Sequence, residues 1–353
     1  MENKYDIITF GSASRDIYLI SKKFIAGRDI QIAVGTKTEL ADLFFASGGG
    51  GTNAAATFAN QRLKVAYCGQ LGQDYFGNLI VKELKKLRIG TDLIKKTRSK
   101  STNLSVFLAF PGQDITILVY RGASDLLSRK NIPWPKIKNT RWFYLAPFSG
   151  QLAKLTEDLV NFAKKNKIKV ALNPGYNQLT LPKPVLKRIL NKIDVLILNR
   201  EEASLLTKIP YHVDEVPLSS SPLLRKRSSA KEKEIFKKID KMTNGIAIMT
   251  KGGQGVVVSD GKYLYRAPSL YLKIVNSGGL KFIDGTGAGD AFGAGFVAGM
   301  IQKDDIVFAI QLAMANSGYV TTKWGAKEGL LKKGQKWPKI KVTKEPCSEH
   351  DLC

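Results

Sequence analysis

Short hydrophobic runs alternate with amphipathic segments along most of the chain. The runs are rich in Val, Ile and aromatic residues, which is typical of buried strands. We expect strands within YDIITFG, KVAYCGQ, WFYLA, IKVALN, DVLILN, GIAIMT and GVVVSD. Strands that alternate with helices form a mostly parallel sheet with helices on both faces. The pattern therefore predicts an α/β protein with three layers.

The segments between these runs carry helical periodicity. Residues 74–87 have apolar positions close to the 3.6-residue period of an amphipathic helix, at Phe76, Leu79, Ile80, Leu84 and Leu87. Further helices are expected over residues 52–63, 151–165, 229–242, 288–301 and 304–323.

Two regions interrupt the alternation. Residues 17–47 contain extended segments without a helical pattern, and residues 102–120 are typical of two strands around a PGQD turn. Together they predict a small β-sheet that projects from the main domain as a lid, which suits chemistry that must exclude water.

We interpret residues 1–330 as one domain that includes both lid segments. An exposed insertion is expected at about residues 210–231, where SSSP and RKRSSAK interrupt the pattern. Residues 331–353 are expected to add a last strand, in KIKVT, and a tail.

The formal net charge is +25 over 353 residues. Such an excess can indicate a polyanionic partner. The basic residues are scattered over the polar faces of expected helices and over loops, so we interpret them as a solvated surface and expect no nucleic-acid partner. The sequence shows no leader pattern and no apolar run of the roughly 18 residues that span a bilayer. We therefore expect a cytoplasmic protein without a membrane partner.

The segment DGTGAGDAF places three glycines directly before a predicted helix that begins near Asp290. Glycine allows the backbone to approach a ligand closely. The first amides of a helix have no internal acceptor and lie at the positive end of its dipole, so an anion such as a phosphoryl group fits there. A carboxylate beside that anion can accept a proton from an attacking hydroxyl. A simple N-cap role explains Asp290 equally well.

A second glycine-rich segment, ASGGGGTNAAATFA, also precedes a predicted helix. It loosely fits the dinucleotide fingerprint through Gly49, Gly51 and Ala54, which leaves a nicotinamide oxidoreductase as an alternative. The next strand ends in no acidic residue to hold a ribose, and the Walker pattern is absent.

Two further motifs follow predicted strands. In LILNREEASLLT, Asn199 and Glu202 can face the same way at a strand's carboxyl end, where oxygen groups suit hydrated Mg²⁺. An acidic first helical turn explains them as well. In MTKGGQGVVV, a glycine-rich turn between strands is explained by a hairpin or by a nucleotide contact.

With these motifs, the chain resembles the ribokinase-like, or PfkB-type, carbohydrate kinase family over nearly its full length. The resemblance rests on GGGGTNAA, NREE and DGTGAGDAFGAGF in that order, and on the two strand-rich regions. It implies the ribokinase-like three-layer fold with a β-sheet lid. It also implies a phosphotransferase with an alcohol acceptor that uses ATP and Mg²⁺, and K⁺ in many relatives.

The resemblance implies roles for the matching residues on the nucleotide side. Asp290 would be the catalytic base beside anion-hole amides from Gly287, Ala288 and Gly289. Asn199 and Glu202 would organise Mg²⁺ through water. The ATP phosphates, ribose and adenine would be bordered by Thr250, Gly252, Gly253, Gly255 and Asn316.

On the acceptor side, the resemblance implies that Asp16 holds two hydroxyls of the acceptor, together with Gly49 and Asn53. Asp284 would lie at a position that many relatives use for a monovalent cation, usually K⁺. Because many relatives pair through their lids, a homodimer is expected.

Gly285 replaces a Thr or Ser that is common in the family, but the backbone can still turn there, so we expect activity to survive. Two other departures weaken a specific assignment to ribose: Gly50 stands where ribokinases proper tend to have Lys, and YLAPFSG offers no acidic residue to a sugar. We therefore expect a kinase acting on a hydroxymethyl group of a sugar or related small molecule, with a nucleoside kinase as the alternative. A different class also stays open, a non-catalytic protein that binds a nucleotide, a sugar or nucleic acid.

Overall fold

A nine-stranded sheet forms the body of the protein. The computed structural model describes residues 3–26, 29–32, 34–109, 115–211, 222–270 and 281–347. The strand order is β17-β16-β15-β14-β13-β12-β11-β1-β6. The parallel strands are β1 (Tyr5–Phe10), β6 (Val65–Cys68), β11 (Thr140–Leu145), β12 (Lys169–Leu172), β13 (Val195–Asn199) and β14 (Ile246–Thr250). The antiparallel strands are β15 (Val256–Ser259), β16 (Tyr263–Ala267) and β17 (Thr343–Pro346). Each expected run contains one of these strands, so the mostly parallel sheet is confirmed.

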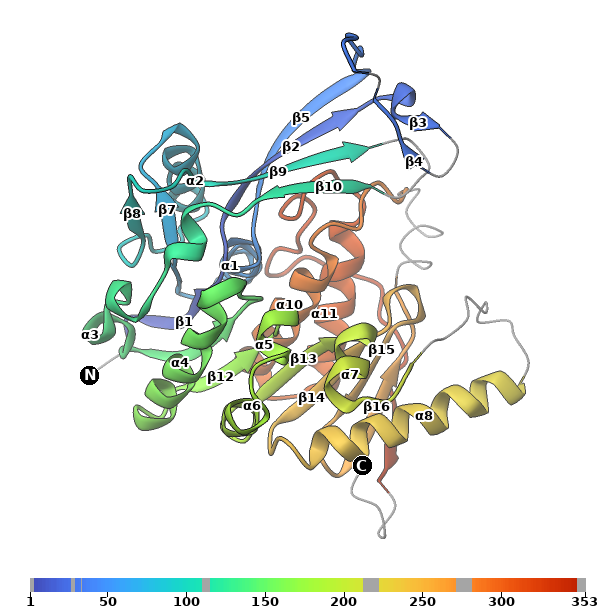
Figure 1. Cartoon of the computed structure of the whole chain (residues 1–353). Coiled ribbons are helices and arrows are strands. Elements are labelled where there is room, and N and C mark those ends of the chain that lie inside the picture. The colour runs from blue at the N-terminus through green and yellow to red at the C-terminus, as the bar shows by residue number, and fades with distance from the viewer. Residues whose placement is uncertain are drawn as a thin grey trace.

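Helices cover both faces of this sheet (Figure 1). One face carries α4 (Leu155–Lys165), α5 (Tyr176–Leu179), α6 (Lys183–Leu190), α7 (Arg200–Thr207) and α8 (Pro222–Asp240). The other carries α1 (Gly50–Asn60), α2 (Tyr75–Lys86), α10 (Ala288–Lys303) and α11 (Ile306–Val320). Neighbouring strand residues point into different cores because side chains alternate along a strand: Phe143 faces the first group of helices and Tyr144 the second.

The predicted helices occur, with one large difference in extent. Helix α8 begins at Pro222, within the expected insertion at residues 210–231, rather than at residue 229. Residues 212–221 of that insertion lie outside the described residues. The short elements α3 (Trp134–Ile137), α5 and α6 were not predicted, because four to eight residues are too few to show a clear helical period.

A separate four-stranded sheet projects above the body in Figure 1, in the order β10-β9-β2-β5. Each interrupted region supplies two strands. These are β2 (Ser14–Ile20) and β5 (Asp42–Gly48) from the first, and β9 (Asn103–Ala109) and β10 (Thr116–Tyr120) from the second. Strand β2 begins three residues before the predicted boundary, so Asp16 lies within the small sheet. The PGQD turn lies outside the described residues.

Two small sheets complete the strands, β3 (Ile25–Ala26) with β4 (Asp29–Ile30) and β7 (Gln70–Gly72) with β8 (Lys95–Thr97). Among the helices that the structure describes, none combines the length and the apolar content needed to cross a bilayer.

The last strand was predicted at the wrong place. It runs over Thr343–Pro346 and pairs with β16, so only the final residue of KIKVT belongs to it. Ile340 and Val342 instead pack into the core beside α10 and α11. Strand β17 is a largely exposed edge strand, and such a strand carries no hydrophobic run that would mark it in the sequence.

Asp240, at the end of α8, is a titratable group within the body. Its Oδ2 accepts a hydrogen bond from Ser259 Oγ at 2.7 Å, while its buried Oδ1 has no partner among the residues described. Burial, together with the nearby charge of Asp260, raises the pKa of Asp240 to about 7. In the unfolded chain the pKa returns to about 3.9. The folded state therefore binds more protons between these values, and the free energy of unfolding falls as the pH rises through this window.

We predict that Asp240→Asn removes this pH dependence, because the amide keeps an oxygen for Ser259 but carries no charge. The stability of the variant relative to the wild type should increase by about 2 kcal/mol between pH 5 and pH 8. Urea unfolding at the two pH values measures the difference, with the exposed Asp42→Asn as the matched control. A constant difference between Asp240→Asn and the wild type would contradict the prediction.

Candidate active site

Two adjacent cavities lie where α10 begins beside β13 and β14. The larger, of about 580 Å³, is lined by residues that include Thr250, Gly252, Gly253, Gly255, Phe282, Met314, Ser317 and Gly318. The smaller, of about 240 Å³, is lined by residues that include Pro147, Asn173, Asn199, Glu202, Gly287 and Asp290. Thr250 and Gly289 line both. All four residues expected at the ATP phosphates and ribose therefore line the larger cavity, and those expected at Mg²⁺ and the base line the smaller.

The start of α10 is shaped by Gly287, the residue before the helix. Its φ of 77° is left-handed, and a Cβ there would lie 2.4 Å from the Cβ of Ala326. No side chain caps this helix. The amide of Ala288 already donates to the carbonyl of Gly285 at 3.2 Å. Gly289 and Asp290 occupy the following positions, where amides have no acceptor within the helix. Their amides, more than that of Ala288, can therefore receive an anion.

Asp290 does not act as the N-cap of α10. Its Oδ2 accepts a hydrogen bond from Asn53 Nδ2 at 2.9 Å, and Asn53 belongs to α1. Burial raises the pKa of Asp290, while the bond from Asn53 and the charge of Lys327 oppose that shift. The carboxylate is thus held beside the smaller cavity in surroundings that make it a stronger proton acceptor than an exposed Asp.

Asn199 and Glu202 form a reciprocal capping box at the start of α7. The backbone N–H of Glu202 donates to Asn199 Oδ1, and that of Asn199 donates to Glu202 Oε2, both at 2.8 Å. Burial and the charges of Glu201 and Asp290 raise the pKa of Glu202 to about 7. A divalent cation would relieve this crowding of negative charge, so the pair fits Mg²⁺. The described residues contain no cluster of three or more His, Cys, Asp or Glu that would form a complete metal cage.

Among the predicted acceptor residues, Asn53 contacts Asp290, and Asp16 and Gly49 lie around the glycine segment that leads into the helix of Asn53. Asp16 is buried on β2, and its Oδ1 accepts a hydrogen bond from Ser14 Oγ at 2.7 Å. A Cβ on Gly48 would lie 2.0 Å from Asp16 Oδ2, so the glycine segment packs directly on this carboxylate. Gly49 precedes α1 with a φ of 91°, and Asn53 extends from the same helix to Asp290.

Asp284 is buried and only partly hydrogen-bonded. Its Oδ1 accepts bonds from the N–H and the hydroxyl of Thr286, at 2.9 and 2.7 Å. Its Oδ2 and the hydroxyl oxygen of Tyr18 are both buried without a partner among the residues described. The negative charge of Asp284 contributes to raising the pKa of Tyr18, after burial as the main cause. An unsatisfied buried carboxylate oxygen fits a monovalent cation.

Asn316 does not appear among the residues that line the larger cavity; Met314, Ser317 and Gly318 of the same helix do. Asn316 is buried, its Nδ2 donates to the carbonyl of Ala291 at 2.8 Å, and its Oδ1 accepts from the N–H of Leu331 at 2.9 Å. Its polar atoms thus join α10, α11 and the segment after α11. The predicted place of Asn316 near the adenine stays a prediction without support from this geometry.

Several residues around the cavities were not predicted. Asn173 directly follows β12 and lines the smaller cavity, and its position at a strand's carboxyl end could have identified it. Ser14, which bonds Asp16, and Lys327, which acts electrostatically on Asp16 and Asp290, lie in segments that carry no recognisable pattern.

Comparison with known proteins gives a consistent result. The model of the family described as pfkB family carbohydrate kinase matches residues 4–333. A ribokinase from Lactococcus lactis subsp. lactis is 26% identical over 306 residues, which cover 85% of this chain and 87% of that protein. A ribokinase from Cryptococcus neoformans var. grubii serotype A in complex with ADP has a TM-score of 0.72 at 21% identity, over 93% of this chain and 97% of that chain. A nucleoside kinase from Methanocaldococcus jannaschii has a TM-score of 0.68 at 18% identity, over 94% and 96%. The predicted fold is confirmed by these structures.

Two glycines at the start of α10 should respond differently to an added methyl group. We predict that Gly287→Ala lowers the free energy of unfolding by about 1–3 kcal/mol, because its φ is positive and Ala326 occupies the space. Gly289→Ala is the matched control, since a Cβ there meets nothing within 4 Å. Denaturant unfolding measures both; equal stabilities would contradict the prediction.

Proposed function

The chain belongs to the pfkB family of carbohydrate kinases, and we propose that it transfers the γ-phosphoryl group of ATP, with Mg²⁺, to a hydroxymethyl group of a sugar or related small molecule. Family membership makes it a phosphotransferase with an alcohol acceptor. The observation that carries the finer proposal is the position of Asp290, which lies at the start of α10 beside the smaller cavity and is bonded to Asn53 of the acceptor side.

In the proposed reaction, Asp290 takes the proton of the acceptor hydroxyl while the oxygen of that hydroxyl forms a bond to the γ-phosphorus. The bond between that phosphorus and the β-γ bridging oxygen breaks, and ADP leaves. The amides at the start of α10 stabilise negative charge on the transferring group. Because the phosphoryl group requires little covalent chemistry from the protein, positioning of the two substrates contributes most of the acceleration.

Mg²⁺ would neutralise phosphate charge between the two cavities. Asn199 and Glu202 would hold it through water, since their oxygens already serve the start of α7 and since Mg²⁺ retains several waters in such sites. K⁺ would satisfy the free oxygen of Asp284 on the other side of the Gly285–Gly289 loop. There it would fix the backbone that precedes α10.

Asp16 and Asn53 would bind the acceptor and orient its hydroxyls. A sugar is favoured over a nucleoside because two aromatic rings on the inner face of the small sheet are already packed against each other. Tyr18 and Phe107 stack on each other with ring centroids 4.2 Å apart, and both are buried. They therefore present no free ring face on which a nucleobase could stack.

The outer face of the small sheet supports a homodimer. Cross-strand pairing places Phe45, Ile17, Val106 and Leu118 in one row on this face. Phe45 is 48% exposed and Leu118 is 55% exposed. Leu43 and Tyr120 extend the same face beside that row. An apolar sheet face of this extent is typical of a protein–protein interface, and a second copy of the chain would cover it.

We predict that Asp290→Asn lowers kcat by about 10²–10⁴-fold while the Kd for ATP stays within about threefold, because the amide cannot accept the proton. ADP release is measured with ATP, Mg²⁺ and a panel of sugars and nucleosides, and ATP binding by calorimetry. Asp305→Asn, at the N-cap of the neighbouring α11, is the matched control. Retained turnover in Asp290→Asn would refute the base assignment. ATP binding without turnover of any acceptor by the wild type would favour a non-catalytic protein.

We predict that the wild type is a dimer and that Phe45→Glu/Leu118→Glu is a monomer, because the charges would be buried without partners. Sedimentation velocity measures both. Tyr75→Glu, at a 72% exposed position on α2, is the control and should leave the dimer intact. A monomeric wild type would contradict the prediction.

A further inference from the structure

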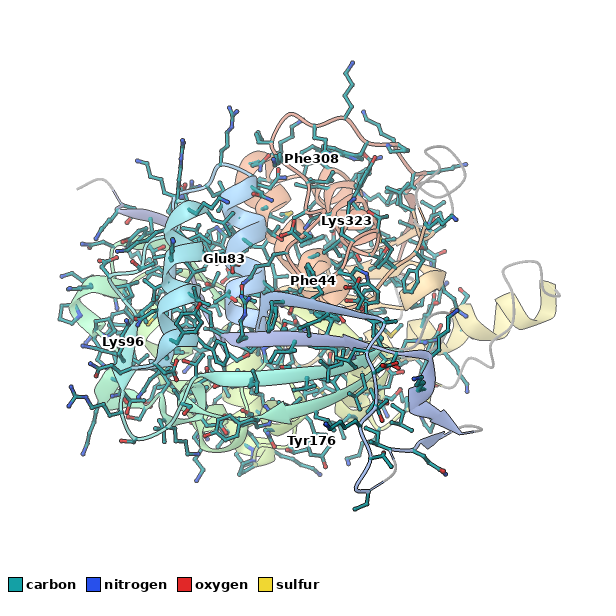
Figure 2. All side chains as sticks on the ribbon, turned by 90° about the horizontal axis from the view of Figure 1, so that it is seen from above. Phe44, Glu83, Lys96, Tyr176, Phe308 and Lys323 are labelled. Atoms are coloured by element: carbon teal, nitrogen blue, oxygen red, sulfur yellow. The ribbon has the colours of Figure 1, made fainter. Side chains whose placement is uncertain are left out.

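Lys327 is a buried cation at the base of the small sheet. Its side chain is 8% exposed, and it lies in the segment after α11. Its Nζ donates to Ser47 Oγ at 2.5 Å and lies 3.3 Å from Glu83 Oε1. Ser47 Oγ in turn donates to Glu83 Oε1 at 2.5 Å. Figure 2 labels Glu83 on α2 and Phe44 on β5, the strand that carries Ser47.

These contacts do not by themselves explain why an ammonium group is buried here. Removing a charge from water is costly unless it is paired closely. Among the described residues, Glu83 is the only carboxylate in ion-pair contact with Lys327, at a long 3.3 Å, and the Glu83 side chain is itself 33% exposed. Exposed charge pairs contribute little. Burial accordingly lowers the pKa of Lys327, and further negative charge besides Glu83 opposes that shift.

That charge comes from the acceptor side of the site. Lys327 interacts electrostatically with Asp16 of β2 and with Asp290 of α10. The other charged groups that act on it are Glu83 of α2, which has the opposite sign, and Arg15 of β2, which has the same sign. Lys327 thus lies among three carboxylates, two of which belong to the proposed site.

We infer that Lys327 is a positioning residue for phosphoryl transfer, because its buried ammonium bonds Ser47 directly before the glycine that packs on Asp16, and fixes the base of β5 against α2. The inference rests on the proposed function and adds a residue to it. Lys327 contacts neither the transferred group nor the reacting hydroxyl. It acts through the residue that orients the acceptor and the residue that accepts its proton.

The electrostatic part follows from opposing effects on the two carboxyls. Burial raises the pKa of Asp16 and of Asp290, and the charge of Lys327 lowers both. Without the ammonium, both groups would hold their protons to higher pH, so less of the enzyme would carry an ionised base and an ionised acceptor ligand.

The mechanical part follows from where Ser47 lies. It is the second-last residue of β5, and Gly48 and Gly49 lead from it directly into α1. Nearby, a Cβ on Gly325 would lie 3.1 Å from Ala46 Cβ, and Trp324 packs edge-on against Tyr18 with centroids 5.5 Å apart. Residues 324–327 therefore fix the end of β5 against α2, directly before the two glycines that lead into the helix that carries Asn53.

The test is the pH dependence of kcat/KM for the acceptor in Lys327→Met and Lys327→Gln, which remove the charge, and in Lys327→Arg, which keeps it. Lys323→Met is the matched control, since Lys323 lies exposed in the same segment (Figure 2). In the neutral variants, the acidic limb of the pH profile of kcat/KM should move to higher pH by about one unit. At pH values below this limb, kcat/KM should therefore fall about tenfold. The same variants should raise KM for the acceptor and leave KM for ATP unchanged. Lys327→Arg and Lys323→Met should keep the wild-type limb.

Lys327→Gln keeps hydrogen-bonding groups for Ser47, so a folded neutral variant is available if Lys327→Met does not fold. An unmoved acidic limb in an active neutral variant would overturn the inference and leave the proposed function intact, as would a fall in kcat that only follows a lower Tm. Absence of turnover in the wild type would overturn the proposed function, and the inference with it.

Discussion

The hydrogen bond between Asn53 and Asp290 is the interaction on which the proposed site depends. It joins two helix starts, each preceded by a glycine with positive φ, across 2.9 Å. Because Asn53 donates, the bond favours the ionised form of Asp290 in a place where burial disfavours it. The same bond sets the distance between the acceptor side, on α1 and β2, and the nucleotide side, on α10. If this bond were lost, Asp290 and the residues proposed to bind the acceptor would no longer be held in fixed relative positions.

Close packing of α10 on α11 keeps this arrangement rigid. A Cβ on Gly299 would lie 2.6 Å from Ala309 Cα, and one on Gly295 would lie 3.0 Å from Ala313 Cα. Gly295 and Gly299 therefore serve helix packing, whereas Gly287 shapes the start of α10, where an anion is proposed to bind. Asn316 completes the arrangement by donating to the carbonyl of Ala291, one residue beyond Asp290. A residue predicted near the adenine thus has a structural role that the sequence could not reveal.

Much of the fold was predictable because buried strands carry continuous hydrophobic runs: the seven expected runs correspond to six parallel strands and the antiparallel β15 of one sheet. The exposed strand β17 and the short helices α5 and α6 lack such a signal and were misplaced or missed. Motifs with glycines and carboxylates at fixed spacing identified residues that line both cavities. Lys327 could not be predicted, because its surroundings come from Ser47 and Glu83, which lie far from it in the chain.

The two cavities share Thr250 and Gly289, so the space proposed for the nucleotide lies directly beside the space near the base. One molecule that extends past these two residues would occupy both cavities. A compound that links adenosine to a polyol through a chain of phosphates would lose its rotational and translational freedom only once on binding, whereas two separate ligands lose it twice. The adjacency of the cavities thus makes this protein a natural target for inhibitors that combine both substrates in one molecule.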